Sequence, residues 1–281
     1  MPLRLVKSGQ TIETAGDWRR SERSTGASRS AHYLLGHNEL TEAFFGKGYP
    51  EVPWEIVEAG TSHPDLEGLS LEWGIPSHRV AIGPFGAEHD QTDVVLVGSC
   101  RDRRVAVSVD AVADESFGDG LADFVRRWTL PPERPRTDAV AAMPPEGRRP
   151  APAPERPDRR PEELAELIRA LVPDAPPSIK AVLRLRLLLA VASALVFARR
   201  QHAHVALLAI LEFDRDDWPG RGTREHRYEL NDLAVALTGP GAALSPGDCL
   251  GPIRVPGNEL IPGDIPVYLA MGHRNAGRHF H

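Results

Sequence analysis

Residues 91–115, QTDVVLVGSCRDRRVAVSVDAVADE, contain the pattern that decides the fold class. Two runs rich in β-branched residues, DVVLVG and RVAVSV, flank the polar run SCRDR. This pattern predicts a β-hairpin, because strands of this kind are bounded by polar turn residues. If the chain turns at Arg101 and Asp102, antiparallel pairing sets Asp93 opposite Asp110 on one face of the sheet. The hairpin therefore predicts two acids together at its open end.

Asp93 and Asp110 would have Cβ atoms about 4.5–5.5 Å apart in this register. Two carboxylates that close repel each other unless they share a proton, hold a cation or turn apart into water. Mg²⁺ suits such a pair, because it takes one or two carboxylates and completes its shell with water and phosphate oxygens. The alternative is that both residues are ordinary charges at strand ends. A shift of one residue in register would place the two acids on opposite faces.

The overall composition indicates a folded protein without a strong charge bias. The chain has 281 residues, 41% of them hydrophobic, which suits one large domain or two small ones. Its net charge of −6 argues against a globally basic nucleic-acid-binding protein, although a local basic groove is compatible with it. Two cysteines, Cys100 and Cys249, are too few for a disulfide framework or a structural zinc site.

The longest apolar run, LLLAVASALVFA at residues 187–198, predicts a buried core helix. It is too short to cross a membrane, because a spanning helix needs about 20 apolar residues. The N-terminal sequence MPLRLVKSGQ turns polar almost at once and lacks the pattern of a signal peptide. We therefore expect a cytoplasmic protein with no membrane partner.

The rest of the chain, after a polar start with little periodicity, alternates between predicted strands and helices. We expect strands at residues 78–86, 204–213 and 265–271, and helices at residues 30–48, 119–128, 161–172, 178–201 and 228–239. The antiparallel strands come first and are followed by helix, strand, helix and strand. This order predicts an α/β fold in which a mixed central sheet is flanked by helices.

Residues 131–161, PPERPRTDAVAAMPPEGRRPAPAPERPDRRP, differ from their surroundings in being rich in proline and arginine. Such a segment buries too little apolar surface to order itself, which predicts a flexible linker or insertion. It separates residues 1–130, which contain the hairpin, from residues 162–281, the helix–strand part of the same domain. Its arginines make it a candidate contact for a protein partner.

Several segments together resemble an uncharacterised bacterial family of the PD-(D/E)XK nuclease-like superfamily. The core of the resemblance is IPSHRVAIGPFG, HDQTDVVLVG and RVAVSVDAVADESFGD. The segments GDWRR, SAHYLL, LRLRLLLAVASAL and GDIPVYLAMG are similar to further parts of that family, so the resemblance covers most of the chain outside the proline-rich segment. It implies a restriction-endonuclease-like α/β fold, with nucleic acid as the partner.

Carried over residue by residue, the resemblance places Asp93 and Asp110 at the two motif acids, which implies Mg²⁺ as cofactor. The motif lysine, which orients the attacking water and stabilises charge at the phosphate, corresponds to Val112. Valine can do neither, and Lys180 and Arg186 are the candidates to replace it. The resemblance therefore implies a nuclease-like protein that is catalytically weakened or inactive. The alternative is an active Mg²⁺-dependent nucleic-acid phosphodiesterase with a relocated basic residue.

Other polar residues are weaker candidates for a site. Glu88 precedes the first acid and either adds a metal ligand or solvates a loop. His202 and His204 have the spacing of residues on one face of a strand, but zinc needs a third ligand that the sequence does not identify. A structural partner in a larger assembly, docked through the proline-rich segment, is a third functional class.

Overall fold

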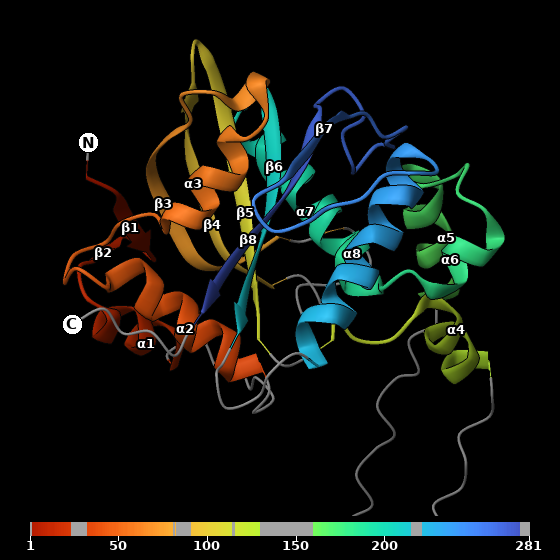
Figure 1. Ribbon diagram of the computed structural model, residues 1–281, viewed down its shortest axis with the longest axis horizontal. Helices are drawn as coiled ribbons and strands as arrows, with labels where there is room; N and C mark the ends of the chain where they lie inside the picture. Colours follow the sequence, from red (N-terminus) through yellow and green to blue (C-terminus); the bar gives the residue numbers. More distant parts are fainter. Residues whose placement is uncertain are drawn as a thin grey trace, which may run out of the picture.

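The fold is built around one mixed β-sheet, which the computed structural model describes over residues 2–23, 33–80, 82, 91–113, 116–129, 160–214 and 221–275. Within these residues the sheet has eight strands in the order β2-β1-β3-β4-β5-β6-β8-β7 (Figure 1). Their bounds are β1 Arg4–Lys7, β2 Gln10–Ile12, β3 Ser70–Arg79, β4 Gln91–Cys100, β5 Arg103–Val112, β6 Val205–Asp214, β7 Cys249–Ile253 and β8 Val267–Asn275. The consecutive strands β3, β4 and β5 are antiparallel, whereas β5, β6 and β8 are parallel. The predicted mixed α/β sheet is confirmed.

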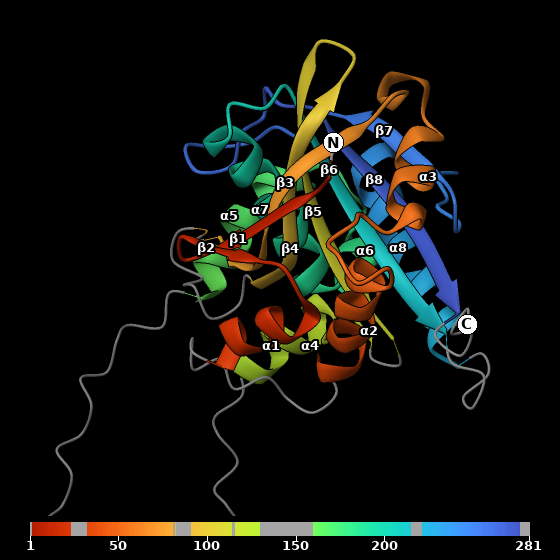
Figure 2. The same cartoon turned by 90° about the vertical axis from the view of Figure 1, so that its left-hand side faces the viewer.

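Helices cover both faces of this sheet (Figures 1 and 2). One face is covered by α1 Ala15–Arg23, α2 Tyr33–Phe45 and α3 Trp54–Thr61, and the short 3₁₀ helix Pro64–Leu66 follows α3. The other face carries α4 Leu121–Thr129, α5 Arg160–Leu171, α6 Pro177–Val182, α7 Leu185–Arg200 and α8 Arg221–Thr238. None of the helices that the structure describes is long and apolar enough to cross a membrane.

The central strands are apolar on both sides because helices pack against both faces. In β4, Val94 and Leu96 belong to the core under α1–α3, whereas Val95 and Val97 belong to the core around α7. Side chains of successive strand residues point to opposite faces, so this alternation assigns each residue of the hairpin to one core. Strands on both sides of residues 130–159 share the sheet, and the predicted linker itself lies almost entirely outside the described residues.

The β4–β5 hairpin has the predicted register. Val95 pairs with Ser108 and Val97 with Ala106. The chain turns at Arg101, whose backbone adopts a positive φ of 54°. The position of the turn determines which residues of the two strands pair and which face of the sheet they share. This holds up to the open end of the hairpin, which carries the two acids.

The single helix expected at residues 178–201 is wrong, because two helices occupy this segment. Helix α6 ends at Val182 and α7 begins at Leu185. Between them Arg184 is extended, with φ −87° and ψ 126°, and forms a β-bridge with Gly120. The Leu183 carbonyl accepts the amide of Leu121 at 2.8 Å. Contacts with a segment more than 60 residues away in sequence therefore interrupt the helix.

The strand expected at residues 78–86 is also misplaced, because β3 runs over residues 70–79. It includes Pro76, and β1 pairs only with Trp73 and Gly74 of this strand. The region around Pro76 therefore has a neighbouring strand, β4, on one side only. Proline is tolerated at such an edge because no strand on the other side needs a hydrogen bond from the N–H that proline lacks. Strands β1, β2 and β7 lie in stretches whose sequence carries little strand periodicity.

Candidate functional site at the ends of strands β4, β5 and β6

Asp93 and Asp110 lie together at the open end of the β4–β5 hairpin. The paired ladder ends at Val94 and Val109, and the two acids are the next residues outward. The backbone amide of Asp93 donates to Oδ1 of Asp110 at 3.4 Å. Both residues are buried, with 4% and 5% of their surfaces exposed. The structure therefore brings the two predicted site residues side by side, in a place that water reaches poorly.

The carboxylate of Asp93 takes over the role of a strand partner where the ladder stops. Its Oδ2 accepts the backbone amide of Ala111 at 2.9 Å. Its Oδ1 lies 3.3 Å from Nδ1 of His37, which is 2% exposed. A buried amide needs a hydrogen-bond partner, and here a side chain supplies it. Asp93 thus links β4, β5 and helix α2.

Helix α2 approaches the end of β5 closely because glycine precedes His37. A Cβ atom on Gly36 would lie 3.1 Å from the carbonyl oxygen of Ala111, so a larger residue would push the helix away. The other side of His37 contacts the ring of Trp18, with ring centroids 5.8 Å apart in an edge-to-face arrangement. Trp18 itself is fully buried. His37 is therefore held between α1 and the hairpin.

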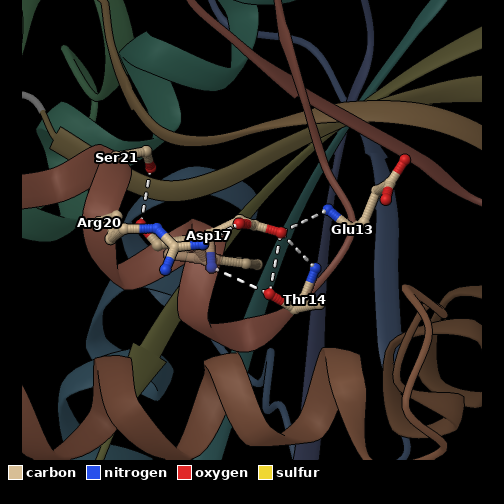
Figure 3. Close-up of polar contacts among 6 residues, drawn as sticks. Glu13, Thr14, Asp17, Arg20 and Ser21 are labelled. Atoms are coloured by element: carbon tan, nitrogen blue, oxygen red, sulfur yellow. Dashed lines mark hydrogen bonds and ion pairs between the residues drawn. The ribbon is translucent and has the colours of Figure 1, made fainter.

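The start of α1 is fixed by a reciprocal cap, which Figure 3 shows. The Thr14 hydroxyl oxygen accepts the amide of Asp17 at 3.1 Å, and the Asp17 carboxylate accepts the amide of Thr14 at 3.0 Å. A side chain three residues into the helix that returns to the capping residue stabilises a helix start. The hydrogen bond from the Thr14 hydroxyl is the main cause of the lowered pKa of Asp17, followed by that from the Arg20 guanidinium. This cap positions Trp18, and through it His37.

Val112 stands where the motif lysine would be, and it is completely buried in the core around α7. Its neighbour on β6 is Glu212, which is paired with it in register and so lies on the same face of the sheet. The position therefore has a carboxylate beside it but carries no cation of its own.

Glu212 forms a buried pair with His226 of α8, and the sequence did not identify it. Glu212 Oε1 lies 2.9 Å from Nδ1 of His226, and both side chains are 0% exposed. Within the described residues, Oε2 of Glu212 has no hydrogen-bond partner. The signal for Glu212 was its place in the otherwise apolar run HVALLAILEF. His226 lies in a charged, turn-rich stretch and gave no signal.

Arg186 is connected to this pair through Phe117, whereas Lys180 is engaged elsewhere. The guanidinium carbon of Arg186 is 5.7 Å from the ring centroid of Phe117. The ring centroids of Phe117 and His226 are 5.5 Å apart. The ammonium group of Lys180 donates to the carbonyl of Pro173 at 2.6 Å, after the end of α5. Of the two candidate replacements, Arg186 is the one that the structure connects to the neighbourhood of Glu212.

The segment that carries Phe117 is fastened by a separate ion pair. Glu229 of α8 accepts the backbone amide of Phe117 at 3.0 Å and binds the Arg184 guanidinium at 2.7 Å. The same guanidinium donates to the carbonyl of Gly118 at 2.9 Å. Arg184, at the break between α6 and α7, therefore ties the end of the hairpin to α8.

A metal ion at this site would have Asp93 and Asp110 as its protein ligands. Among the described residues, no three histidine, cysteine, aspartate or glutamate side chains are grouped closely enough to hold a metal. Oxygens of both carboxylates already accept backbone amides. Mg²⁺ tolerates one or two carboxylates but needs room for water on its remaining positions. The residues present match the ligand type, and their burial leaves little space for that water.

Of the weaker candidates, His202 and His204 do not join the site. Glu88 lies outside the described residues. Nδ1 of His204 accepts the backbone amide of Arg104 at 3.0 Å, a structural contact at the far end of β5. His202 is exposed in the turn after α7, with a positive φ of 51°. These two histidines therefore serve the connection between α7 and β6.

Comparison with known proteins gives one assignment. No curated protein and no solved structure matches the chain. The model of one family, described as "Domain of unknown function (DUF6946)", matches residues 12–267. This match includes the hairpin, the Glu212–His226 pair and five of the eight strands in full, β3 to β7. The chain therefore belongs to the DUF6946 family.

Proposed function

We propose that this chain is a PD-(D/E)XK nuclease-like protein that is catalytically weakened or inactive and whose partner is nucleic acid. The observation that carries the proposal is the pair Asp93 and Asp110 at the open end of the β4–β5 hairpin, beside a buried Val112. The two acids match the motif of the superfamily that the sequence resembles. The valine replaces the one motif residue that handles the attacking water.

The arrangement of the sheet supports this reading. Three consecutive antiparallel strands, β3, β4 and β5, are followed by the crossing helix α7 and by β6, which is parallel to β5. This is a mixed sheet flanked by helices, as the resemblance implies. A fold alone does not determine an activity, so the functional argument rests on the acids and on Val112.

The environment of the acids favours weak or absent catalysis. A metal-dependent phosphodiesterase needs an ion with open positions for water and phosphate. Here the Asp93 carboxylate already accepts the Ala111 amide and contacts the His37 ring, and both acids are at most 5% exposed. Valine provides no charge and no proton. These features support a role in binding or interaction in place of efficient cleavage.

An active enzyme is the second candidate, and the position of Arg186 favours it. Its guanidinium lies over the ring of Phe117, and the same ring contacts His226 of the buried Glu212–His226 pair. Arginine is permanently charged, so it would stabilise negative charge on a phosphate but would not transfer a proton. In this reading Asp93 and Asp110 hold Mg²⁺, and Arg186 supplies the charge that the motif lysine gives in relatives.

Cleavage assays separate the two candidates. Purified protein is incubated with Mg²⁺ or Mn²⁺ and with single- and double-stranded DNA and RNA, beside the double variant Asp93→Asn/Asp110→Asn. The weakened protein gives the same cleavage as the double variant, while fluorescence anisotropy detects nucleic-acid binding. Metal-dependent cleavage that the double variant lacks would overturn the first proposal. If that activity also falls in Arg186→Ala but not in Arg227→Ala, an exposed control on α8, the second candidate is supported.

A further inference from the structure

A groove lies between α2, α3 and the end of β8, on the face of the sheet that α1–α3 cover. Its volume is about 480 Å³, within the range of sites that hold small ligands or side chains. Figures 1 and 2 show α2 and α3 beside the end of β8. The apolar part of the lining comes from α2, from the connection to α3 and from the first residue of α3, at Ala43, Phe44, Val52, Pro53 and Trp54. The lining includes neither acid of the hairpin.

One wall of the groove is a buried ion pair. The Glu55 carboxylate is 3% exposed and binds the Arg274 guanidinium through two contacts, of which Oε2 to Nη2 is 2.7 Å. A carboxylate and a guanidinium match each other in this two-point geometry, which fixes both side chains. This wall therefore holds α3 against β8 and presents no unpaired charge to the groove.

The other carboxylates of the lining, and its lysine, are also engaged within the chain. Lys47 binds Glu51 at 2.8 Å. Glu42 binds Arg19 of α1, and Glu39 has a partner as well. An ionised side chain that enters the groove would lose water without meeting an unpaired counter-charge, which is unfavourable. The charges of the lining therefore favour an uncharged occupant.

The rim of the groove carries exposed aromatic side chains. Trp54 is 61% exposed and Tyr49, in the connection before α3, is 52% exposed. Tryptophan is buried to a large extent in most folded proteins. Ile56, two residues further along α3, is 1% exposed and packs in the core, so α3 is docked on the sheet with Trp54 left outside. Tryptophan and tyrosine are enriched among the residues that dominate binding energy at protein interfaces.

The connection that carries these aromatic residues is held by its own hydrogen bonds. The amide of Gly48 donates to the carbonyl of Phe45 at 2.8 Å, and the amide of Glu51 donates to the carbonyl of Phe44 at 2.9 Å. Pro53 fixes its own φ directly before α3. A binding surface on an ordered backbone loses less conformational entropy when it binds. The connection therefore presents its two aromatic side chains in a prepared arrangement.

We propose that this groove binds a segment of a partner protein through an uncharged apolar or aromatic side chain. That side chain enters the groove against Val52 and Trp54, and Tyr49 contacts the segment at the rim. The paired charges of the lining determine this chemistry, because they leave no counter-charge for a basic or acidic group. A protein segment fits better than a small molecule, since Tyr49 lies outside the lining and extends the contact surface.

This interaction surface goes beyond the proposed function, because it involves neither the acids of the hairpin nor nucleic acid. The test selects ligands without assuming their sequence. A displayed library of random peptides is selected on the immobilised full chain, and peptides that bind Ala43→Gln equally well are discarded, because glutamine at this partly buried lining position fills the groove. Retained peptides are labelled with fluorescein, and fluorescence anisotropy measures their affinities. We expect their shared residues to be apolar or aromatic and uncharged.

Variants outside the selection test the contacts independently. Trp54→Ala should weaken binding by about thirtyfold and Tyr49→Ala by about fivefold, as expected for interface aromatic residues. Trp54→Phe retains an aromatic face and should recover most of the affinity. Glu42→Gln should change it by less than about twofold, because Arg19 already neutralises this carboxylate. The matched control is Tyr228→Ala, a residue 70% exposed on α8 at the other face of the sheet, which should bind as the wild type does.

Four results would overturn the proposal. The selection could retain no peptide, or it could retain peptides whose shared residues are charged. Tyr228→Ala could weaken binding as much as Trp54→Ala, or affinity could fall more than about tenfold between about 0.05 and 0.5 M salt, which would indicate charged contacts.

The oligomeric state distinguishes a second copy of the chain from a separate partner. Light scattering of the wild type at increasing concentration should show a monomer. A dimer that Trp54→Ala dissociates would contradict the proposal, because a second copy would then occupy the groove. Circular dichroism verifies that each variant is folded. Tyr49 and Trp54 are exposed, so their substitution leaves the core intact.

Discussion

The Asp93 carboxylate accepts the backbone amide of Ala111 at 2.9 Å, just beyond the last paired residues of the β4–β5 ladder. A residue that the sequence nominates as a metal ligand thus completes the hydrogen bonding of a strand. The same carboxylate contacts His37, so it also connects the hairpin to α2. This structural role is independent of any metal and makes a prediction about stability.

Asp93→Ala should destabilise the protein by about 2–4 kcal/mol, because it leaves the buried Ala111 amide without its acceptor. Asp93→Asn retains an acceptor oxygen and should cost about half as much. Urea unfolding in metal-free buffer measures both. Asp102→Ala, in the exposed hairpin turn, is the control and should change stability by less than about 0.5 kcal/mol. Equal stability of Asp93→Ala and Asp102→Ala would refute the structural role.

Val112→Lys should be better tolerated than Val107→Lys, although both valines are 0% exposed on β5. Val112 is paired with Glu212, whose Oε2 can accept the new ammonium group, whereas Val107 is paired with Leu207. We expect Val112→Lys and Glu212→Gln to show a coupling energy of about 1–3 kcal/mol in a double-mutant cycle. A cycle with zero coupling would mean that Glu212 does not receive the lysine.

Any metal-dependent cleavage gained by Val112→Lys should disappear in Val112→Lys/Asp110→Asn.

Stability should depend on pH through His78. Burial is the main cause of its lowered pKa, followed by the charges of Arg200 and Lys7. The unfolded state, with a pKa near 6.5, then binds more protons than the folded state below that pH. The stability from neutral His78 is therefore complete above pH 6.5 and is lost as pH falls through 6.5 toward the lower folded pKa.

His78→Gln should flatten this dependence when unfolding free energies are compared at a series of pH values on both sides of that point. His202→Gln removes an exposed histidine and should retain the wild-type slope. One titrating group changes the free energy of unfolding by at most about 1.4 kcal/mol per pH unit. Urea titrations resolve a difference of this size between wild type and His78→Gln. Identical slopes for wild type and His78→Gln would show that His78 does not carry the effect.

Both cysteines should resist alkylation in the folded protein. Burial raises the pKa of the Cys249 thiol to about 12, so almost none is thiolate at mildly alkaline pH. Cys100 is 0% exposed, and its thiol donates to the carbonyls of Asp65 and Glu67. Mass spectrometry after iodoacetamide treatment should find both unlabelled until urea is added. Asp102→Cys provides an exposed thiol for comparison, and labelling of Cys249 at the same rate would contradict the prediction.

The hairpin and its register could be predicted from sequence because they depend on local information. Alternating apolar residues on two strands and one short turn determine which residues face each other. Asp93 and Asp110 therefore meet as predicted. The buried strand β6 and helices α4 and α5 were predicted for the same reason, since their apolar patterns are continuous.

The missed features depend on contacts between distant segments. The break before α7 exists because Arg184 reaches Glu229 and Gly118, and no helix-breaking residue marks it. Glu212 and His226 become a pair only when α8 packs over the end of β6. His37 reaches Asp93 because Gly36 lets α2 approach β5. Periodicity in a single sequence reports which face of an element is apolar, but not which polar residues from different elements will meet.

Calorimetric titration of the wild-type protein with Mg²⁺ and Mn²⁺ tests the central claim most directly. The same titrations on Asp93→Asn and Asp110→Asn show whether any binding uses these two acids. Because both carboxylates are buried and already accept backbone amides, we predict no saturable binding tighter than millimolar, and traces that match those of the variants. Saturable wild-type binding at micromolar concentrations that disappears in both variants would contradict the account. It would identify the end of the hairpin as a working metal centre.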